Sequence, residues 1–279
     1  MGSARPFPNA LSIALRASLM IAVISSTILG RDASGFEDRI PQYRVEGKGP
    51  LLIYVAGLDG TGDLFFKQAP ALARLYRVVT FRSRDGGRFT YEDLADDVAA
   101  IINNLGEQRA TIVAESFGGG VALTFALRHP AMVERLVIVN SFPRFHGRVK
   151  IKVAILSNQV LPYWLTSTVR KAANTVGLQA DGVSGEDRDR FFKAIRTVKR
   201  EGYLRRLQLI AELNVEDRLS EIKAPTLFIA GEKDLLVPSV KEARLMAARM
   251  PNAKIRIIKS AGHVCLLGSR VRLVDLLAE

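Results

Sequence analysis

The stretch AESFGGG, residues 114–120, joins an apolar run at 111–114 to a stretch with helical patterning at 121–128. A serine on so sharp a strand-to-helix turn is pushed out of the sheet, and its hydroxyl is left exposed. The pattern small-x-Ser-x-Gly is weak by itself, and a serine here could also be a helix N-cap in a glycine-rich turn. Its position between a strand and a helix makes Ser116 a candidate nucleophile.

Composition favours one large α/β domain with an insertion. The chain has 279 residues, of which 48% are hydrophobic, enough to bury a single sizeable core. Its one cysteine, Cys265, excludes an internal disulfide framework. Cys265 and the three histidines are scattered without metal-ligand spacing. The sequence therefore predicts no metal site and no cofactor.

The positive charge is concentrated in the middle of the chain. The net charge is +12, and residues 144–206 contain 14 Lys or Arg against 5 Asp or Glu, an excess of 9. No nucleic-acid motif accompanies this excess, so we expect no nucleic-acid partner. A solvated basic face, attraction to an anionic membrane surface and attraction to an anionic substrate remain open.

The N-terminus resembles a signal or anchor segment. Arg5 and Arg16 precede an apolar run at 17–30, which is short for a membrane span but suits a signal sequence or marginal anchor. We therefore expect export or membrane attachment, and a cytoplasmic location if the segment has neither role. The alternative is an upstream extension, with Met20 as the true start.

Apolar strand-like runs alternate with helical patterns along the chain. The strand-like runs lie at 51–56, 77–81, 111–114, 136–140, 226–230 and 255–258. Helical patterns lie at 90–105, 121–128 and 239–250, and a terminal helix is expected from about Leu266. Thr90 with Asp93 resembles a capping box at the first helix. Strands and helices in alternation predict a mostly parallel sheet with helices on both faces.

The same patterns predict the domain organisation. Residues 1–39 are the signal-like segment, and residues 40–141 with 223–279 form the α/β core. Residues 142–222 have helical patterning without strand-like runs, which predicts a basic helical cap inserted in the core. The apolar stretch at 160–165 could shape an acyl pocket in that cap.

A serine nucleophile needs a base, and the chain offers three histidines. His263 directly follows the last strand-like run, which places it in a loop at the carboxyl end of the sheet, where sites are built in open α/β folds. His129 precedes Pro130 at a helix end, where histidine usually complements the helix dipole. His146 begins the basic segment and is interpreted as a surface or hinge residue. His263 is the predicted base.

The histidine in turn needs an acid that orients its ring. Asp234 lies four residues past the run at 226–230, on the same predicted rim as His263. The turn carries Glu232 as well, and an Asx turn is the alternative role for Asp234. The chain order is then Ser116, Asp234, His263.

Acyl transfer also needs donors for the oxygen that becomes negative. Phe117 follows the serine and would supply one backbone N–H. The loop after the first strand-like run would supply the second, most simply from Leu58, because Gly57 and Gly60 allow a sharply turned backbone.

These motifs together resemble the α/β-hydrolase superfamily from about Leu51 to the C-terminus. The matching stretches are AGLDGTG at 56–62, AESFGG at 114–119, GEKDLLVP at 231–238 and AGHVCLL at 261–267. Ala114 replaces the usual first glycine of the serine turn, and Ala56 replaces a histidine that often precedes the loop glycine. The resemblance implies an α/β-hydrolase fold with a Ser-His-Asp triad, and its glycine loop is similar to that of branches that handle lipid acyl groups.

The sequence thus predicts a serine hydrolase that cleaves a small-molecule carboxylic ester through an acyl-enzyme. The alternatives are an acyltransferase or thioesterase with the same triad and, less favoured, a non-catalytic binding protein. Cys265, close to His263, is interpreted as a small buried hydrophobe. Glu115 is expected to pack or to contact a loop. The acyl chain, the acceptor and the oligomeric state stay open.

Overall fold

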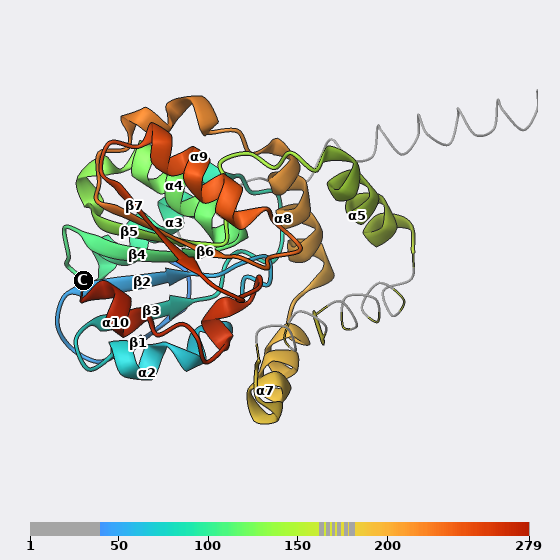
Figure 1. Ribbon diagram of the computed structural model, residues 1–279, viewed down its shortest axis with the longest axis horizontal. Helices are drawn as coiled ribbons and strands as arrows, with labels where there is room; N and C mark the ends of the chain where they lie inside the picture. The colour runs from blue at the N-terminus through green and yellow to red at the C-terminus, as the bar shows by residue number, and fades with distance from the viewer. Residues whose placement is uncertain are drawn as a thin grey trace, which may run out of the picture. The chain divides into compact units, whose positions relative to one another are not determined.

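The computed structural model describes residues 40–161, 165, 168, 171, 174–175, 178 and 182–278. Within them a single seven-stranded sheet has the order β1-β3-β2-β4-β5-β6-β7 (Figure 1). Its strands are β1 (Tyr43–Glu46), β2 (Leu51–Val55), β3 (Arg77–Phe81), β4 (Ala110–Glu115), β5 (Val133–Val139), β6 (Thr226–Gly231) and β7 (Ala253–Ile258). Only the β1–β3 pair is antiparallel among these strands. The predicted mostly parallel α/β fold is confirmed.

The central strands are continuous apolar runs because both faces of the sheet are covered. Successive side chains of a strand point to opposite faces. Thus Ile53 and Val55 of β2 join one hydrophobic core, whereas Leu52 and Tyr54 join the other. All five residues of β2 are buried. Each face of the sheet therefore has its own core.

Helices from different parts of the chain cover the two faces (Figure 1). The first core contains residues of α3 (Tyr91–Asn104), α4 (Phe117–Arg128), α8 (Arg200–Glu212) and α9 (Ser239–Arg249). The second contains residues of α2 (Ala69–Leu72), the 3-10 turn η4 (Cys265–Leu267) and α10 (Leu273–Leu277). The remaining elements are η1 (Asp63–Lys67), η2 (Pro130–Met132), α5 (Arg148–Val160), α7 (Gly185–Ile195) and η3 (Glu216–Glu221).

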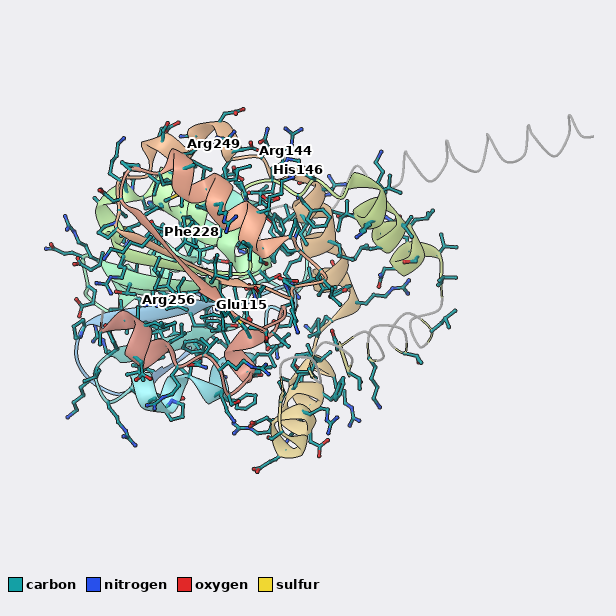
Figure 2. The ribbon with its side chains drawn as sticks, viewed as in Figure 1. Glu115, Arg144, His146, Phe228, Arg249 and Arg256 are labelled. Carbon is teal, nitrogen blue, oxygen red and sulfur yellow. The ribbon has the colours of Figure 1, made fainter. Side chains whose placement is uncertain are left out.

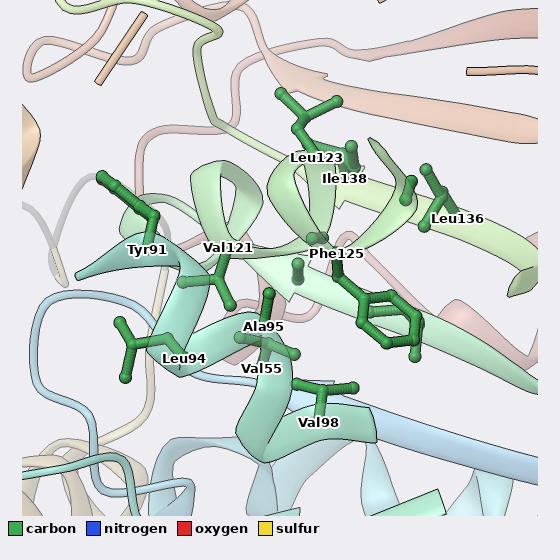
Figure 3. Close-up of a cluster of buried hydrophobic side chains, with 14 of the residues drawn as sticks. Val55, Tyr91, Leu94, Ala95, Val98, Val121, Leu123, Phe125, Leu136 and Ile138 are labelled. Carbon is green, nitrogen blue, oxygen red and sulfur yellow. The ribbon is translucent and has the colours of Figure 1, made fainter. Parts of the chain in front are cut away.

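Helix α3 begins at the predicted capping box. Thr90 Oγ1 accepts from the Asp93 N–H, and the Asp93 carboxylate accepts from the Thr90 N–H. Figure 3 shows Ala95 and Val98 of α3 beside Val121 and Phe125 of α4, within the first core. These contacts fix α4 over the centre of the sheet.

Helix α4 approaches the sheet closely because three of its first four residues are glycines. A Cβ on Gly118 would lie 2.4 Å from the carbonyl oxygen of Val55, and one on Gly119 would lie 2.1 Å from Ser141 Oγ. Both distances are much shorter than a van der Waals contact, so a methyl group would clash at either position. The glycines after Ser116 are therefore required by packing between α4 and the ends of β2 and β5.

The segment between β5 and β6 carries α5, α7, α8 and η3. Leu207 and Ile210 of α8 pack into the first core, whereas Phe191 of α7 lies in a separate small cluster with Leu64 and Leu267. Part of the predicted cap thus belongs to the packing of the sheet. The boundaries 40–141, 142–222 and 223–279 stay predictions. Residues 162–164 of the apolar stretch at 160–165 lie outside the described residues.

Two secondary-structure expectations differ from the structure. Strand β1 was not expected, because it is an edge strand with mostly exposed side chains and has no apolar run. The terminal helix expected from Leu266 is instead η4, followed by the separate short helix α10. Gly268 follows η4 with extended backbone and so divides the two.

The prediction of export or membrane anchoring is corrected. No helix among the described residues is both long and apolar enough to cross a membrane. The segment 1–39 that carried the prediction lies outside those residues, and the assigned location is withdrawn.

Gly118→Ala should destabilise the fold. Alanine normally favours a helix over glycine by about 1 kcal/mol, but here the new methyl group meets the backbone of β2. Overpacking of this kind costs about 1–3 kcal/mol, so we expect a lower free energy of unfolding in urea denaturation. The control is Gly185→Ala in α7, where the nearest atom to a new Cβ is 3.9 Å away. Equal stability of Gly118→Ala and the wild type would contradict this packing.

Candidate active site

The carboxyl ends of three parallel strands carry the predicted chemical groups. Ser116 follows β4, Asp234 lies in the loop after β6, and His263 lies in the loop after β7. Parallel strands end at one edge of a sheet, so these loops converge there. Three positions, of which the first and the last are 147 residues apart along the chain, are brought together in this way.

Ser116 occupies a strained turn between β4 and α4. Its backbone has φ 54° and ψ −118°, a conformation that non-glycine residues seldom adopt. The Ser116 N–H donates to the Val139 carbonyl of β5 at 2.9 Å, and the Ser116 carbonyl accepts from Ser141 Oγ at 2.6 Å. Bonds on both sides of the residue hold the turn, which is how strain of this kind persists.

The three side chains form a continuous line of contacts. Ser116 Oγ lies 2.9 Å from His263 Nε2, and His263 Nδ1 lies 2.7 Å from Asp234 Oδ2. Both separations are hydrogen-bond distances. The His263 side chain is 15% exposed and that of Asp234 only 1%. The acid is thus screened from water, while the histidine remains accessible from solvent.

Asp234 is held in its ionised form. Burial by itself raises the pKa of Asp234, but hydrogen bonds from His263, Ser239 and the Val237 N–H outweigh it, and the pKa lies below its usual value. The carboxylate also accepts from the Leu236 N–H at 2.9 Å. The Asx turn considered from the sequence is therefore present together with the contact to His263, because the two oxygens have different partners.

Asn140, at the end of β5, connects the two loops and was missed in the sequence. Its Nδ2 donates to the carbonyls of Gly262 at 3.0 Å and His263 at 2.8 Å, and its Oδ1 accepts from the Gly231 N–H at 2.7 Å. The side chain of Asn140 is buried, and its backbone has a φ of 47°. A lone asparagine at the end of an apolar run is a turn signal, and that was the only available hint.

The loop after β2 lies beside the serine. A Cβ on Gly57 would be 3.6 Å from Ser116 Cβ. Within the described part of the chain, the Leu58 N–H has no hydrogen-bond acceptor. Phe117 is the first residue of α4, where an N–H has no partner inside the helix. Both predicted donors are thus available at this edge of the sheet.

The other two histidines lie elsewhere. His129 ends α4 with its Nε2 2.7 Å from Asp96 Oδ1 of α3. His146 is labelled beside Arg144 in Figure 2, and its ring nitrogens are 3.7 Å from carboxylate oxygens of Glu216 and Glu242. Each therefore has acidic partners away from Ser116.

Glu115 and Cys265 each accept a hydrogen bond from a neighbouring side chain. The hydroxyl of Tyr54, a fully buried side chain, donates to Glu115 Oε2 at 2.9 Å. Burial and then Glu115 raise the pKa of Tyr54, so the phenol stays protonated as the donor. Cys265 is 1% exposed, and its Sγ accepts from Asn140 Nδ2 at 3.3 Å.

No cluster of three or more His, Cys, Asp or Glu within the described residues could hold a metal ion.

Known proteins resemble this chain in sequence over most of its length. The alpha/beta hydrolase family model matches residues 52–276. A protein of Caulobacter sp. (strain K31), named "Putative carbamate hydrolase RutD", is 29% identical over 231 residues, which is 76% of this chain and 83% of that protein. Its namesake from Serratia proteamaculans (strain 568) is 30% identical over 77% of this chain and 84% of its own length.

Solved structures resemble it in fold. A hydrolase from Pseudomonas aeruginosa PA01 is 24% identical with a TM-score of 0.72, and covers 84% of this chain and 93% of its own. The enol-lactonase from Burkholderia xenovorans LB400 is 20% identical with a TM-score of 0.70, and the match covers 85% of this chain and 96% of its own. With a match to the family model over most of the chain and the fold observed above, this chain belongs to the alpha/beta hydrolase family.

Proposed function

We propose that this hydrolase cleaves carboxylic esters through an acyl-enzyme formed on Ser116. The observation that carries the proposal is the line of contacts from Ser116 Oγ through His263 to Asp234, at 2.9 and 2.7 Å. His263 takes the serine proton as the hydroxyl attacks the ester carbonyl and returns it to the leaving alcohol. The products of this step are an acyl-serine ester and the free alcohol.

The second half of the reaction reuses the same groups. His263 removes a proton from water, which attacks the acyl-serine carbonyl, and Ser116 leaves with that proton as the acid is released. Asp234 keeps the imidazole ring oriented and stabilises its positive charge. The Leu58 and Phe117 N–H groups hold the carbonyl oxygen while it is negative.

The same geometry suits any carbonyl whose oxygen becomes an oxyanion. A carbamate is therefore a second candidate substrate, and the relatives named for carbamate hydrolysis favour testing it. An alcohol in place of water would give an acyltransferase, and a thioester donor would give a thioesterase. A panel of p-nitrophenyl esters from acetate to palmitate and a p-nitrophenyl carbamate, each with and without added alcohol, separates these reactions by product and rate.

Ser116→Ala should abolish covalent labelling by a fluorophosphonate. The reagent reacts with a serine activated by a neighbouring base, and alanine has no hydroxyl to attack it. Labelling is read by the mass shift of the intact protein. Ser157→Ala is the matched control, since Ser157 Oγ donates to the Ala154 carbonyl within α5. Persistent labelling of Ser116→Ala would refute the assignment.

Asp234→Asn should lower kcat by about 10³–10⁴. The amide removes the charge that stabilises the imidazolium and favours the wrong tautomer. Even an ordinary aspartate is ionised in the range in which histidine protonates, and the pKa of Asp234 is lower still, so the carboxylate of the wild type stays charged there. Glu232→Gln is the control, because this exposed acid in the same turn accepts from the Ser260 N–H and the amide oxygen keeps that bond. Similar kcat values for both variants would contradict the role of Asp234.

We further propose that α5 contacts an anionic lipid surface. Exposed apolar side chains recur along one side of this helix, four or three residues apart: Val149, Val153, Leu156 and Val160 are 60–76% exposed. Lys150 and Lys152 flank this stripe, and α5 has no acidic residue. A helix with such a stripe and flanking lysines is suited to the boundary between lipid headgroups and acyl chains.

Leu156→Ser should weaken binding to vesicles of phosphatidylcholine and phosphatidylglycerol about tenfold, because a leucine side chain that enters lipid contributes about 1.5–3 kcal/mol. Sedimentation with the vesicles measures the bound fraction. Leu75→Ser is the matched control, since Leu75 is 56% exposed, close to the 60% of Leu156, and lies between α2 and β3. Equal binding of the two variants would exclude α5 as the contact, and dimer formation sensitive to Leu156→Ser would point to a second copy.

A further inference from the structure

Arg206 is a fully buried arginine on α8. Its side chain has 0% exposure, and it is the largest of the fully buried side chains among the described residues. A guanidinium group away from water needs acceptors for its N–H groups, because an unpaired buried charge is very costly. The acceptors therefore indicate what this residue does.

Its partners lie in two loops at the carboxyl edge of the sheet. Nε donates to the Leu58 carbonyl at 2.9 Å, and Nη2 donates to the Asp59 carbonyl at 3.1 Å, both in the loop after β2. Nη1 donates to the Arg84 carbonyl at 2.8 Å, and Nη2 to Asp85 Oδ1 at 3.1 Å, after β3. One side chain from α8 thus clamps the backbone of the loop at 57–62 to its neighbour.

The clamp complements a tight turn within the loop at 57–62. The Gly60 N–H donates to the Gly57 carbonyl at 3.0 Å, and Gly60 has φ 66°. In a trans peptide the N–H points opposite to the preceding carbonyl. Fixing the Gly57 carbonyl inside the turn therefore directs the Leu58 N–H outward. Arg206 fixes the next two carbonyls, so the whole turn has one orientation.

We propose that Arg206 is a positioning residue that holds the loop at 57–62 so that the Leu58 N–H is presented to the oxyanion. This inference rests on the proposed acyl transfer at Ser116. It makes α8, which lies in the predicted cap, part of the machinery of the reaction without contact to the substrate. The loop keeps its conformation because two elements far apart in the sequence are tied together.

Lysine cannot replace this arginine. Its ammonium is a single point with three donors, whereas the planar guanidinium reaches carbonyls in different directions at once. The longest separation along the chain that the clamp spans is 148 residues. With lysine, at least one of the two loop carbonyls would lose its hydrogen bond. The Leu58 N–H would then no longer be held in one direction.

The test compares Arg206→Lys with Arg205→Lys in the full chain. Arg205, on the same helix, donates to the Phe89 carbonyl at 2.7 Å and to Glu212 at 2.9 Å, away from the loop at 57–62. Losing an oxyanion donor lowers kcat by about 10²–10³, so we expect a fall of about 100-fold in Arg206→Lys. KM should stay within about threefold, because the interaction is made in the transition state. Arg205→Lys should keep both constants within about threefold.

The rates are measured with a p-nitrophenyl ester and divided by the sites titrated with fluorophosphonate, so that only folded enzyme counts. An unchanged kcat per site in Arg206→Lys overturns the inference, as does an equal fall in Arg205→Lys. Should Arg206→Lys not fold, Gly60→Ala replaces it, since a Cβ at Gly60 would lie 2.7 Å from Arg206 Cζ and displace the guanidinium from the loop, and an unchanged kcat per site there has the same meaning. Absence of labelling at Ser116 in the wild type would instead refute the proposed function.

Discussion

The turn from β4 into α4 is the constraint on which the site depends. Ser116 can occupy its strained backbone only while α4 starts in contact with the carboxyl ends of β2 and β5. That approach leaves no space for a Cβ at Gly118 or Gly119. Val139 at the end of the neighbouring strand β5 and Ser141 just after it then bond to the two sides of the serine. The strain is thus held by packing and hydrogen bonds at the middle of the sheet.

Polar groups buried around this turn set the positions of the loops. The Asn140 side chain accepts a bond from the backbone at the end of β6 and donates bonds to the backbone of the loop after β7. Each bond contributes about 1 kcal/mol, but a buried polar group without its partner costs more. The network therefore favours one arrangement of the loops. Asp234 and His263 lie at hydrogen-bond distance as a result of that arrangement.

The basic residues of the segment 144–206 have at least two different environments. Arg206 is buried, and its guanidinium group is hydrogen-bonded to backbone carbonyls and paired with Asp85. Lys150 and Lys152 on α5 are exposed beside an apolar stripe. A count of charges treats these residues alike, although only the second group is available to an external anionic surface. The local excess of positive charge therefore overstates the charge available at the surface.

The sequence by itself determined the parallel sheet and which of its loops hold Ser116, Asp234 and His263. Buried parallel strands are continuous apolar runs, and Ser116 and Asp234 follow two of them, β4 and β6. His263 follows β7, an edge strand whose side chains are mostly exposed but which keeps a short apolar pattern. It did not reveal β1, whose exposed edge leaves no apolar pattern. The burial of Arg206 and the bonds of Asn140 were decided by the tertiary structure alone. Their partners lie 121–148 and 91–125 residues away along the chain, so no local pattern records them.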